Sequence, residues 1–380
     1  MNTRSGLPRF IVCLVTAALL VAAVSAQAPA PRVVAIADIH GDLDAFAGIL
    51  QRARLIDANR RWTGGNATLV QTGDFIDRGP KSRAVMDFLM GLQKEAPRQQ
   101  GRVVVLLGNH EVMNIIGDLR YVIAGDYASF ADDRSERRRR SAYDAYVKLW
   151  RDAPPASLPA SEAEWMAAHP PGFIEHRAAF GPDGAYGRWL RTLPAVAQIN
   201  DSIFVHGGIN PELAVVDVKK INEIVAAEIK FFDQYSKFMV DANLALPFAT
   251  LDELARAAQR RLDQLQKEKK NEDLAPHEKF LGFGGWFSVH PDGPLWFRGY
   301  AEWSLEEGAA LISRLTAAFK VARFVVGHTP QTGGIESRFD GKVYLIDTGM
   351  LSTYYAGGRA SALEIQNGKL TPIYSEEPKR

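Results

Sequence analysis

Residues of the types that bind metal ions follow short apolar segments at several separate places in the sequence. Carboxylate, imidazole and amide side chains stand directly after five such segments, at Asp38, His40, Asp74, Asn109, His206 and His328. One residue of this kind is more often a turn residue, a helix cap or a buried core residue. Six of them after five apolar segments favour a shared metal site.

The spacing of these residues suggests how they divide between two ions. Asp38 and His40 are alternate residues, so on an extended chain both side chains point to one side and can bind one ion. Asp74 is the expected bridging carboxylate, and the second ion is expected to be bound in addition by Asn109, His206 and His328. Mixed carboxylate and imidazole ligands suit Mn, Fe or Zn better than Ca, without distinguishing among the three. Two ions about 3.5–4 Å apart would activate a bridging hydroxide for in-line attack on a phosphate ester.

Further residues near these ligands are suited to hold the phosphate and supply a proton. Arg78 follows Asp74 by four residues and is a candidate for bidentate binding of phosphate oxygens. His110 is the expected general acid for the leaving oxygen, oriented and kept protonated by Asp77. A local salt bridge between Asp77 and Arg78 is the competing interpretation. Arg298 is a second phosphate candidate, or else stacks on the neighbouring tryptophan.

The apolar segments that precede these clusters have the length and composition of buried strands. Continuous runs rich in β-branched residues are typical of strands covered on both faces. Ligands of α/β proteins bind beyond the carboxyl ends of such strands. Helical patterns at Leu43–Arg54 and Lys81–Glu95 alternate with the early strands and indicate βαβ units. The predicted strands are Arg32–Ala37, Ala67–Gln71, Arg102–Leu107, Ser202–Val205, Arg323–Val326 and Lys342–Ile346.

Two long stretches interrupt this alternation of strands and helices. Residues 112–200 carry aromatic and Arg-rich helical segments, and residues 211–280 have the pattern of one or two amphipathic helices. We expect both to be helical insertions in one catalytic domain, residues 32–375. They are predicted to pack as a cap over or beside the edge of the sheet where the strands end.

The first residues of the chain have the pattern of a secretory signal. Two arginines precede an apolar run over residues 10–24, and small residues end at Ala26. We expect a signal peptide at 1–26, a linker at 27–31 and a secreted or periplasmic protein without a stable membrane span. An uncleaved anchor facing the periplasm is the alternative. Cys13, the only cysteine, lies within this signal, so the mature chain excludes a cysteine nucleophile.

The overall composition is that of an ordinary globular protein. Hydrophobic residues make up 47% and charged residues 23% of the chain. A formal net charge of +1 provides no general attraction to nucleic acid, so we expect no nucleic-acid partner. Oligomeric state is left open. The expected partner is a phosphorylated substrate, either a phosphoprotein or a small phosphoester.

Three motifs in combination resemble the signatures of the PPP-type metallophosphatases in the calcineurin-like superfamily. They are Asp-x-His-Gly at 38–41, Gly-Asp-x-x-Asp-Arg-Gly at 73–79 and Gly-Asn-His-Glu at 108–111. His206-Gly-Gly and Gly-His328 are similar to the family's remaining ligand motifs. The resemblance implies an α/β fold with a central β-sandwich flanked by helices. It also implies the same two ligand sets sharing Asp74, with His110 and Asp77 as the acid pair.

The segments 109–122, 294–299 and 326–330 are similar to the bacterial Shewanella-like phosphatase branch. This resemblance implies a phosphoprotein substrate, phosphorylated on Tyr or on Ser/Thr, and Arg78 and Arg298 as phosphate arginines. Two alternatives stay open at this stage. One is a nucleotide or dinucleoside-polyphosphate hydrolase of the same fold, and the other is a non-catalytic module that binds metal or phosphate.

Overall fold

The structure is a computed structural model and describes residues 31–150, 161–213, 217–270, 273–331 and 333–375. The expected signal peptide and nearly all of the linker lie outside these residues. Within them, no helix has the length and apolarity needed to cross a membrane.

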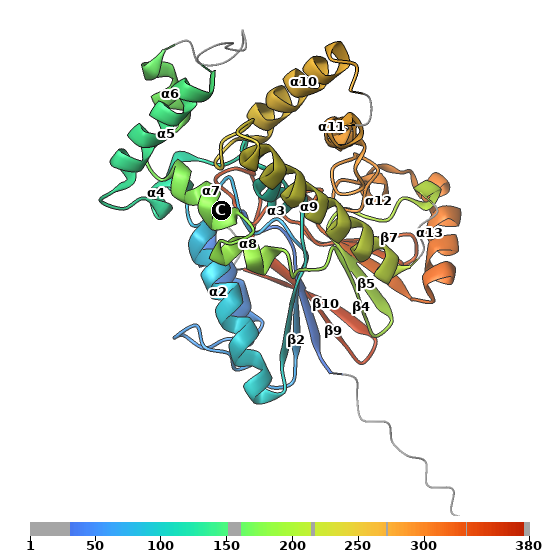
Figure 1. The fold of residues 1–380 in the computed structure, drawn as a ribbon. Coiled ribbons are helices and arrows are strands. Elements are labelled where there is room, and N and C mark those ends of the chain that lie inside the picture. Colours follow the sequence, from blue (N-terminus) through green and yellow to red (C-terminus); the bar gives the residue numbers. More distant parts are fainter. Residues whose placement is uncertain (1–30, 151–160, 214–216, 271–272, 332, 376–380) are drawn as a thin grey trace, which may run out of the picture.

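The first of two five-stranded sheets is built from both ends of the described chain (Figure 1). Its centre is parallel, because α1 (Leu43–Arg52) and α2 (Ser82–Glu95) return the chain to the same edge between successive strands. Two antiparallel strands complete one side. The order across the sheet is β10 (Lys369–Tyr374), β9 (Ser361–Gln366), β1 (Val33–Ile36), β2 (Thr68–Gln71) and β3 (Arg102–Val105).

The second sheet also has a parallel centre with antiparallel strands at its edges. Its order is β4 (Val196–Ile199), β5 (Ser202–Val205), β6 (Arg323–Val326), β8 (Val343–Leu345) and β7 (Glu336–Arg338). The long helix α13 (Leu305–Phe319) precedes β6. Both sheets therefore present a row of parallel strand ends.

The two sheets pack face to face around a small apolar layer. Val33 and Ala35 of β1 lie in this layer together with Phe204 of β5 and Val325 of β6. The alternate residues of the same strands belong to a larger core that the helices cover. Each central strand is thus buried on both faces, which accounts for its uninterrupted apolar sequence. The predicted β-sandwich flanked by helices is confirmed.

All six strands predicted from apolar runs are present, but four others were not predicted. β4 and β7 lie at the edges of the second sheet and are partly exposed, so their sequences are not uniformly apolar. β10 is an edge strand that contains Pro372, a residue tolerated there because an edge strand needs fewer backbone donors. β9 pairs antiparallel with β1 and β10.

Helices also dominate the two stretches that interrupt the strands. α10 begins at a capping box formed by Thr250 and Glu253. Figure 1 shows α5 and α6 projecting away from the sheets, and α10 lying on the side of α9 that is away from the strands. The helices between β3 and β6 are α3 (Asn109–Ile116), α4 (Ala124–Phe130), α5 (Ser135–Trp150), α6 (Glu162–Ala168), α7 (Phe173–Phe180), α8 (Ala185–Leu190), α9 (Val218–Asp241), α10 (Leu251–Lys267), α11 (Ala275–Leu281) and α12 (Gly299–Glu302), followed by α13.

Two contacts tie these outer helices to α3. The Arg177 side chain of α7 donates to the carbonyl of Asn114 (2.8 Å), near the C-terminus of α3. The N–H of Leu251, at the start of α10, donates to the Gly117 carbonyl just after α3 (2.9 Å). Both contacts are made to carbonyl groups at the C-terminal end of α3 or just after it. The outer helices therefore hold α3, whose first residues are Asn109 and His110.

Candidate functional site

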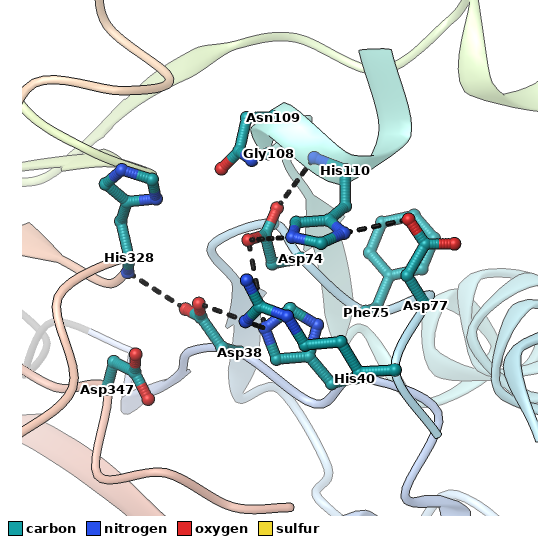
Figure 2. Close-up of polar contacts among 12 residues, drawn as sticks. Asp38, His40, Asp74, Phe75, Asp77, Gly108, Asn109, His110, His328 and Asp347 are labelled. Atoms are coloured by element: carbon teal, nitrogen blue, oxygen red, sulfur yellow. Dashed lines mark hydrogen bonds and ion pairs between the residues drawn. The ribbon is translucent and has the colours of Figure 1, made fainter. Parts of the chain in front are cut away.

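The six candidate metal ligands converge from the two sheets onto one buried cluster, and five of them are labelled in Figure 2, all except His206. Asp38, His40, Asp74 and Asn109 follow the parallel strands of the first sheet, whereas His206 and His328 follow those of the second. None of the six is more than 5% exposed. Residues separated by up to 290 positions in the sequence are thus brought within contact distance.

One oxygen of Asp74 lies at the centre of this cluster. Its Oδ2 is 3.1 Å from His206 Nε2, 3.8 Å from His110 Nε2 and 3.9 Å from His40 Nε2. The Asp38 Oδ2 atom is 3.7 Å from the same nitrogen of His40. Asp74 therefore faces both groups of ligands, as expected of a shared carboxylate.

The second group of ligands is more tightly gathered. His206 Nε2 lies 3.0 Å from Asn109 Oδ1 and 3.1 Å from His328 Nδ1. Together with Asp74 Oδ2, these atoms form a compact set of two imidazole nitrogens, one amide oxygen and one carboxylate oxygen. Such mixed nitrogen and oxygen donors suit first-row transition metals and zinc.

Backbone contacts hold three of these side chains in place. The Nδ1 atoms of His40 and His206 each lie 3.0 Å from a backbone carbonyl, those of Ile76 and Thr72. Bonding one ring nitrogen to a carbonyl directs the other nitrogen into the cluster, an arrangement common among metal-binding histidines. The His328 N–H donates to Asp38 Oδ1 (3.0 Å), so a loop of one sheet orients a carboxylate of the other.

The charges of the cluster fit a bound cation. Burial and the neighbouring Asp347 raise the pKa of Asp38 well above its ordinary value. Burial would also raise the pKa of Asp74, but the facing imidazoles, His206 foremost, outweigh it and hold that pKa well below its ordinary value. Burial would lower the pKa of His206, whereas Asp74 and Asp38 raise it to about 9. Buried carboxylates that repel one another are stabilised by cations, so these residues fit metal ions in both charge and donor type.

His110 lies between Asp74 and Asp77, as Figure 2 shows. Its Nδ1 atom is 2.8 Å from Asp77 Oδ2, while its Nε2 atom faces Asp74 and has no hydrogen-bond partner among the described residues. Asn114, one turn further along α3, donates to both oxygens of Asp77 (3.0 and 2.9 Å). Asn114 and His110 thus hold the buried Asp77 carboxylate in place from two sides. Because Asp77 bonds only Nδ1 of His110, the Nε2 atom is free to exchange a proton with a bound substrate.

Arg78 lies within a cluster of tyrosines at the edge of the site. Its Nη1 atom is 2.7 Å from His40 Nε2 and bonds the Tyr355 hydroxyl. Its guanidinium carbon lies 4.9–5.6 Å from the ring centroids of Tyr121, Tyr354 and Tyr355. Asp77 pairs with His110, and no ion pair joins it to Arg78 among the described residues, so the local salt bridge considered from the sequence is not formed.

Arg298 lies beside His328, whereas Arg78 lies beside His40. Its Nη1 atom donates to the His328 carbonyl (2.9 Å) and to Thr329 Oγ1 (3.1 Å). Trp296 instead packs edge-on against His328, with ring centroids 5.9 Å apart. The guanidinium of Arg298 is thus positioned by the loop that carries a candidate metal ligand.

The backbone of the site is unusual in its dihedral angles. Five non-glycine residues of the site have φ between 47° and 68°, the left-handed region that side chains rarely adopt. Such strain is concentrated at functional sites in proteins, where the surrounding structure holds it. The five residues are His40, Asp74, Asp77, Arg78 and His328.

Close contact between two loops also depends on glycine. A Cβ atom on Gly79 would approach the His40 carbonyl to 2.2 Å, and one on Gly41 would approach the Gly79 carbonyl to 2.6 Å. The glycines of the two motifs therefore allow the turn after β1 to pack against the turn after β2. This packing places His40 and Arg78 side by side.

Three further residues complete the site. Glu111 accepts hydrogen bonds from the N–H groups of Asp74, Phe75 and Gly108 (2.7–3.0 Å) and so joins two loops. Asn114 lies one helical turn after His110, a spacing that places both on one face of α3. Asp347, in the cluster after the sixth predicted strand, is 1% exposed and lies beside Asp38 (Figure 2).

Residues 31–332 match the calcineurin-like phosphoesterase family. Among curated proteins, the chain is 33% identical to an uncharacterized protein of Schizosaccharomyces pombe, over 90% of this chain and 80% of that protein. It is 30% identical to Shewanella-like protein phosphatase 2 of Arabidopsis thaliana, over 91% of this chain and 78% of that one. Among solved structures, the cold-active protein-tyrosine phosphatase of a psychrophilic Shewanella species is 25% identical, with a TM-score of 0.58, over 91% and 81% of the two chains.

Proposed function

Because the chain belongs to the calcineurin-like phosphoesterase family, we propose that it is a metal-dependent phosphatase that hydrolyses phosphate monoesters of proteins. The observation that carries this proposal is the position of His110, fixed by Asp77 on one side and directed toward the ligand cluster on the other. Asp38, His40 and Asp74 would hold one ion, and the second would be held by Asp74, Asn109, His206 and His328. When bound, two ions would supply the attacking hydroxide and neutralise the phosphoryl oxygens.

The protein's own groups have distinct tasks in this proposal. Both arginines contact a candidate ligand residue, Arg78 at His40 and Arg298 at His328, and both would bind phosphate oxygens. His110 would deliver the proton on Nε2 to the leaving oxygen, while Asp77 accepts the hydrogen bond from Nδ1 and stabilises the charged ring. No side chain acts as a nucleophile in this scheme, so the reaction would proceed without a phosphorylated form of the protein.

Tyrosines at the edge of the site favour an aromatic phosphoester. Tyr354 is 54% exposed, and its ring lies 4.9 Å from that of Tyr355. A phosphotyrosine bound with its phosphate at Arg78 would place its own ring beside these rings, where stacking contributes about 0.5–1.5 kcal/mol. We therefore propose phosphotyrosine first, and phosphoserine or phosphothreonine second. The names of the relatives above, a protein phosphatase and a protein-tyrosine phosphatase, support a phosphoprotein substrate.

Parallel kinetics with Mn²⁺ test this proposal. We expect kcat/KM to be highest for a phosphotyrosine peptide, compared with phosphoserine and phosphothreonine peptides and diadenosine tetraphosphate. Tyr354→Ala should lower kcat/KM for the phosphotyrosine peptide about 2- to 10-fold. The matched control is Leu305→Ala, which removes another exposed hydrophobic side chain, far from the site on α13.

Two results would overturn the proposal. A strong preference for diadenosine tetraphosphate would instead indicate a dinucleotide hydrolase. Absence of turnover on every substrate with Mn, Fe or Zn would return the protein to the class of non-catalytic binding modules.

We also propose that the protein is exported, on the sequence of its first 26 residues alone. The expected result is a mature chain that begins at Gln27 when the protein is produced in a bacterial host and its N-terminus is sequenced. An intact N-terminus on membrane-bound protein would favour the anchored alternative.

A further inference from the structure

Asp347 follows a strand of the same sheet as the strands that precede His206 and His328. β5, β6 and β8 are adjacent and parallel, and Val326 of β6 pairs with Leu345 of β8. His328 and Asp347 each follow these paired residues by two positions. Neighbouring strands lie about 4.8 Å apart, so equivalent positions beyond their ends are close in space. The fold therefore places a carboxylate in the same row as two candidate metal ligands.

The Asp347 carboxylate is buried, and one of its oxygens is unused. Its Oδ1 atom accepts the Gly349 N–H (2.9 Å), whereas Oδ2 has no hydrogen-bond partner within the part of the chain that the structure describes. A buried carboxylate oxygen without a partner is costly, since it has lost its hydration. The charged groups that act on Asp347 are those of the cluster itself, Asp74 and Asp38 among them.

The loop around Asp347 keeps this carboxylate in position. The Gln331 N–H, in the loop that follows His328, donates to the Asp347 carbonyl (2.8 Å). The Thr348 hydroxyl bonds the Arg359 carbonyl and Ser361 Oγ, at the start of β9. The residue is thus anchored to both sheets. Its unused oxygen is a fixed feature of the site.

We propose that Asp347 is an additional carboxylate of the metal centre, which strengthens cation binding on the side of Asp38. The inference rests on the proposed function, because it requires that the cluster bind metal. Its physical basis is the sign of the interaction between the two carboxylates. Without a cation, Asp38 and Asp347 repel each other in a buried site. With a cation between or beside them, both are stabilised.

Replacement of Asp347 by asparagine separates this role from a merely structural one. Asn keeps an oxygen for the Gly349 N–H and replaces the other oxygen by a neutral amide nitrogen, so the negative charge is lost. We expect Asp347→Asn to weaken Mn²⁺ binding about 10-fold or more, while the melting temperature of the metal-free protein stays the same or rises. A residue that served only the turn would behave in the opposite way. Its replacement would lower the melting temperature and leave Mn²⁺ binding to the folded protein unchanged.

The full-length chain is stripped with a chelator, and Mn²⁺ affinity is measured by calorimetry beside thermal unfolding of the metal-free protein. Asp126→Asn is the matched control, since Asp126 is a carboxylate that is equally buried (1% exposed). It lies outside the ligand cluster and should leave Mn²⁺ affinity unchanged. Asp347→Ser provides a second variant if the asparagine variant does not fold.

The outcomes distinguish this inference from the proposed function. If the wild type binds Mn²⁺ and Asp347→Asn binds it equally well, the role of Asp347 is overturned and the metal centre stands. If the wild type binds no Mn²⁺, Fe²⁺ or Zn²⁺, both fail together. Weaker binding in Asp347→Asn, with Asp126→Asn unchanged and metal-free stability retained in both, supports the inference.

Discussion

Replacing Asn114 by alanine should slow catalysis although Asn114 touches neither substrate nor metal ligand in the proposed mechanism. The side chain donates to both oxygens of Asp77 (3.0 and 2.9 Å) and to the His110 carbonyl (3.0 Å). It therefore holds the carboxylate that orients the proposed acid. Asp77 and His110 are both at most 2% exposed, so water does not readily replace the lost donor.

The magnitude follows from the kind of hydrogen bond that is lost. A bond to a charged group is worth about 1.5–3 kcal/mol, and one between neutral groups about 0.5–1.5 kcal/mol. We therefore expect Asn114→Ala to lower the free energy of unfolding by about 2–4 kcal/mol. Catalysis depends on the bond to Asp77, and each 1.36 kcal/mol of activation free energy is a factor of ten. The expected fall in kcat is about 10- to 100-fold, with KM nearly unchanged, because phosphate binding is assigned to other residues.

The assay is steady-state hydrolysis of a phosphotyrosine peptide, with unfolding in urea and metal content measured on the same samples. Asn222→Ala is the matched control, because Asn222 also makes three hydrogen bonds, all to the backbone of residues 195 and 196 at the start of β4. It should lose comparable stability and keep its kcat. A folded, metal-loaded Asn114→Ala protein with kcat within twofold of wild type would refute the role assigned to Asp77 and Asn114.

Three further predictions concern stability. Glu111 accepts hydrogen bonds from three backbone N–H groups, and Glu111→Gln would turn an amide N–H group toward one of them. The free energy of unfolding in urea should fall by about 1–3 kcal/mol. An unchanged urea midpoint of unfolding would contradict the role of these bonds. Burial raises the pKa of Asp126 to about 7, so its ionisation destabilises the fold progressively as pH rises from about 4 to 7. Asp126→Asn should therefore raise stability at pH 8, by at most about 4 kcal/mol, and have little effect near pH 4; an equal effect at both pH values would disprove the assignment. Removing metal with a chelator should lower the melting temperature. Adding Mn²⁺ at 100 times its Kd should raise the free energy of unfolding of the metal-free protein by about 2.7 kcal/mol.

The sequence was most informative where a single local feature determines the structure. Uninterrupted apolar runs identify the central strands because those strands are covered on both faces, as β1 and β5 are. Because these runs mark the buried strands, the polar residues that follow them mark the strand ends, where α/β proteins bind ligands. The structure brings all six into one buried cluster.

Residues that act through contacts between distant segments could not be identified in this way. Asp347 follows an apolar run like the others, but only the pairing of β6 with β8 places it beside His328. Arg78 donates a hydrogen bond to Tyr355, which lies 277 positions further along the sequence, and no local sequence pattern predicts such a contact. The edge strands β4 and β7 were missed because partial exposure removes the apolar pattern that marks a buried strand.

The position of β9 in the first sheet has a consequence for the order in which the protein assembles. β1 lies between β2 and β9. Both edges of β1, near residue 33, can therefore be paired only once β9, near residue 365, is present. During synthesis from the N-terminus, β1 therefore keeps an open edge until the residues of β9 (Ser361–Gln366) have been made. Pairing across such a distance is slow, and an open apolar edge invites association with other chains. A nascent chain would thus complete the sheet that positions Asp38 and His40 only after β9 has been made, and it would depend on protection from aggregation until then.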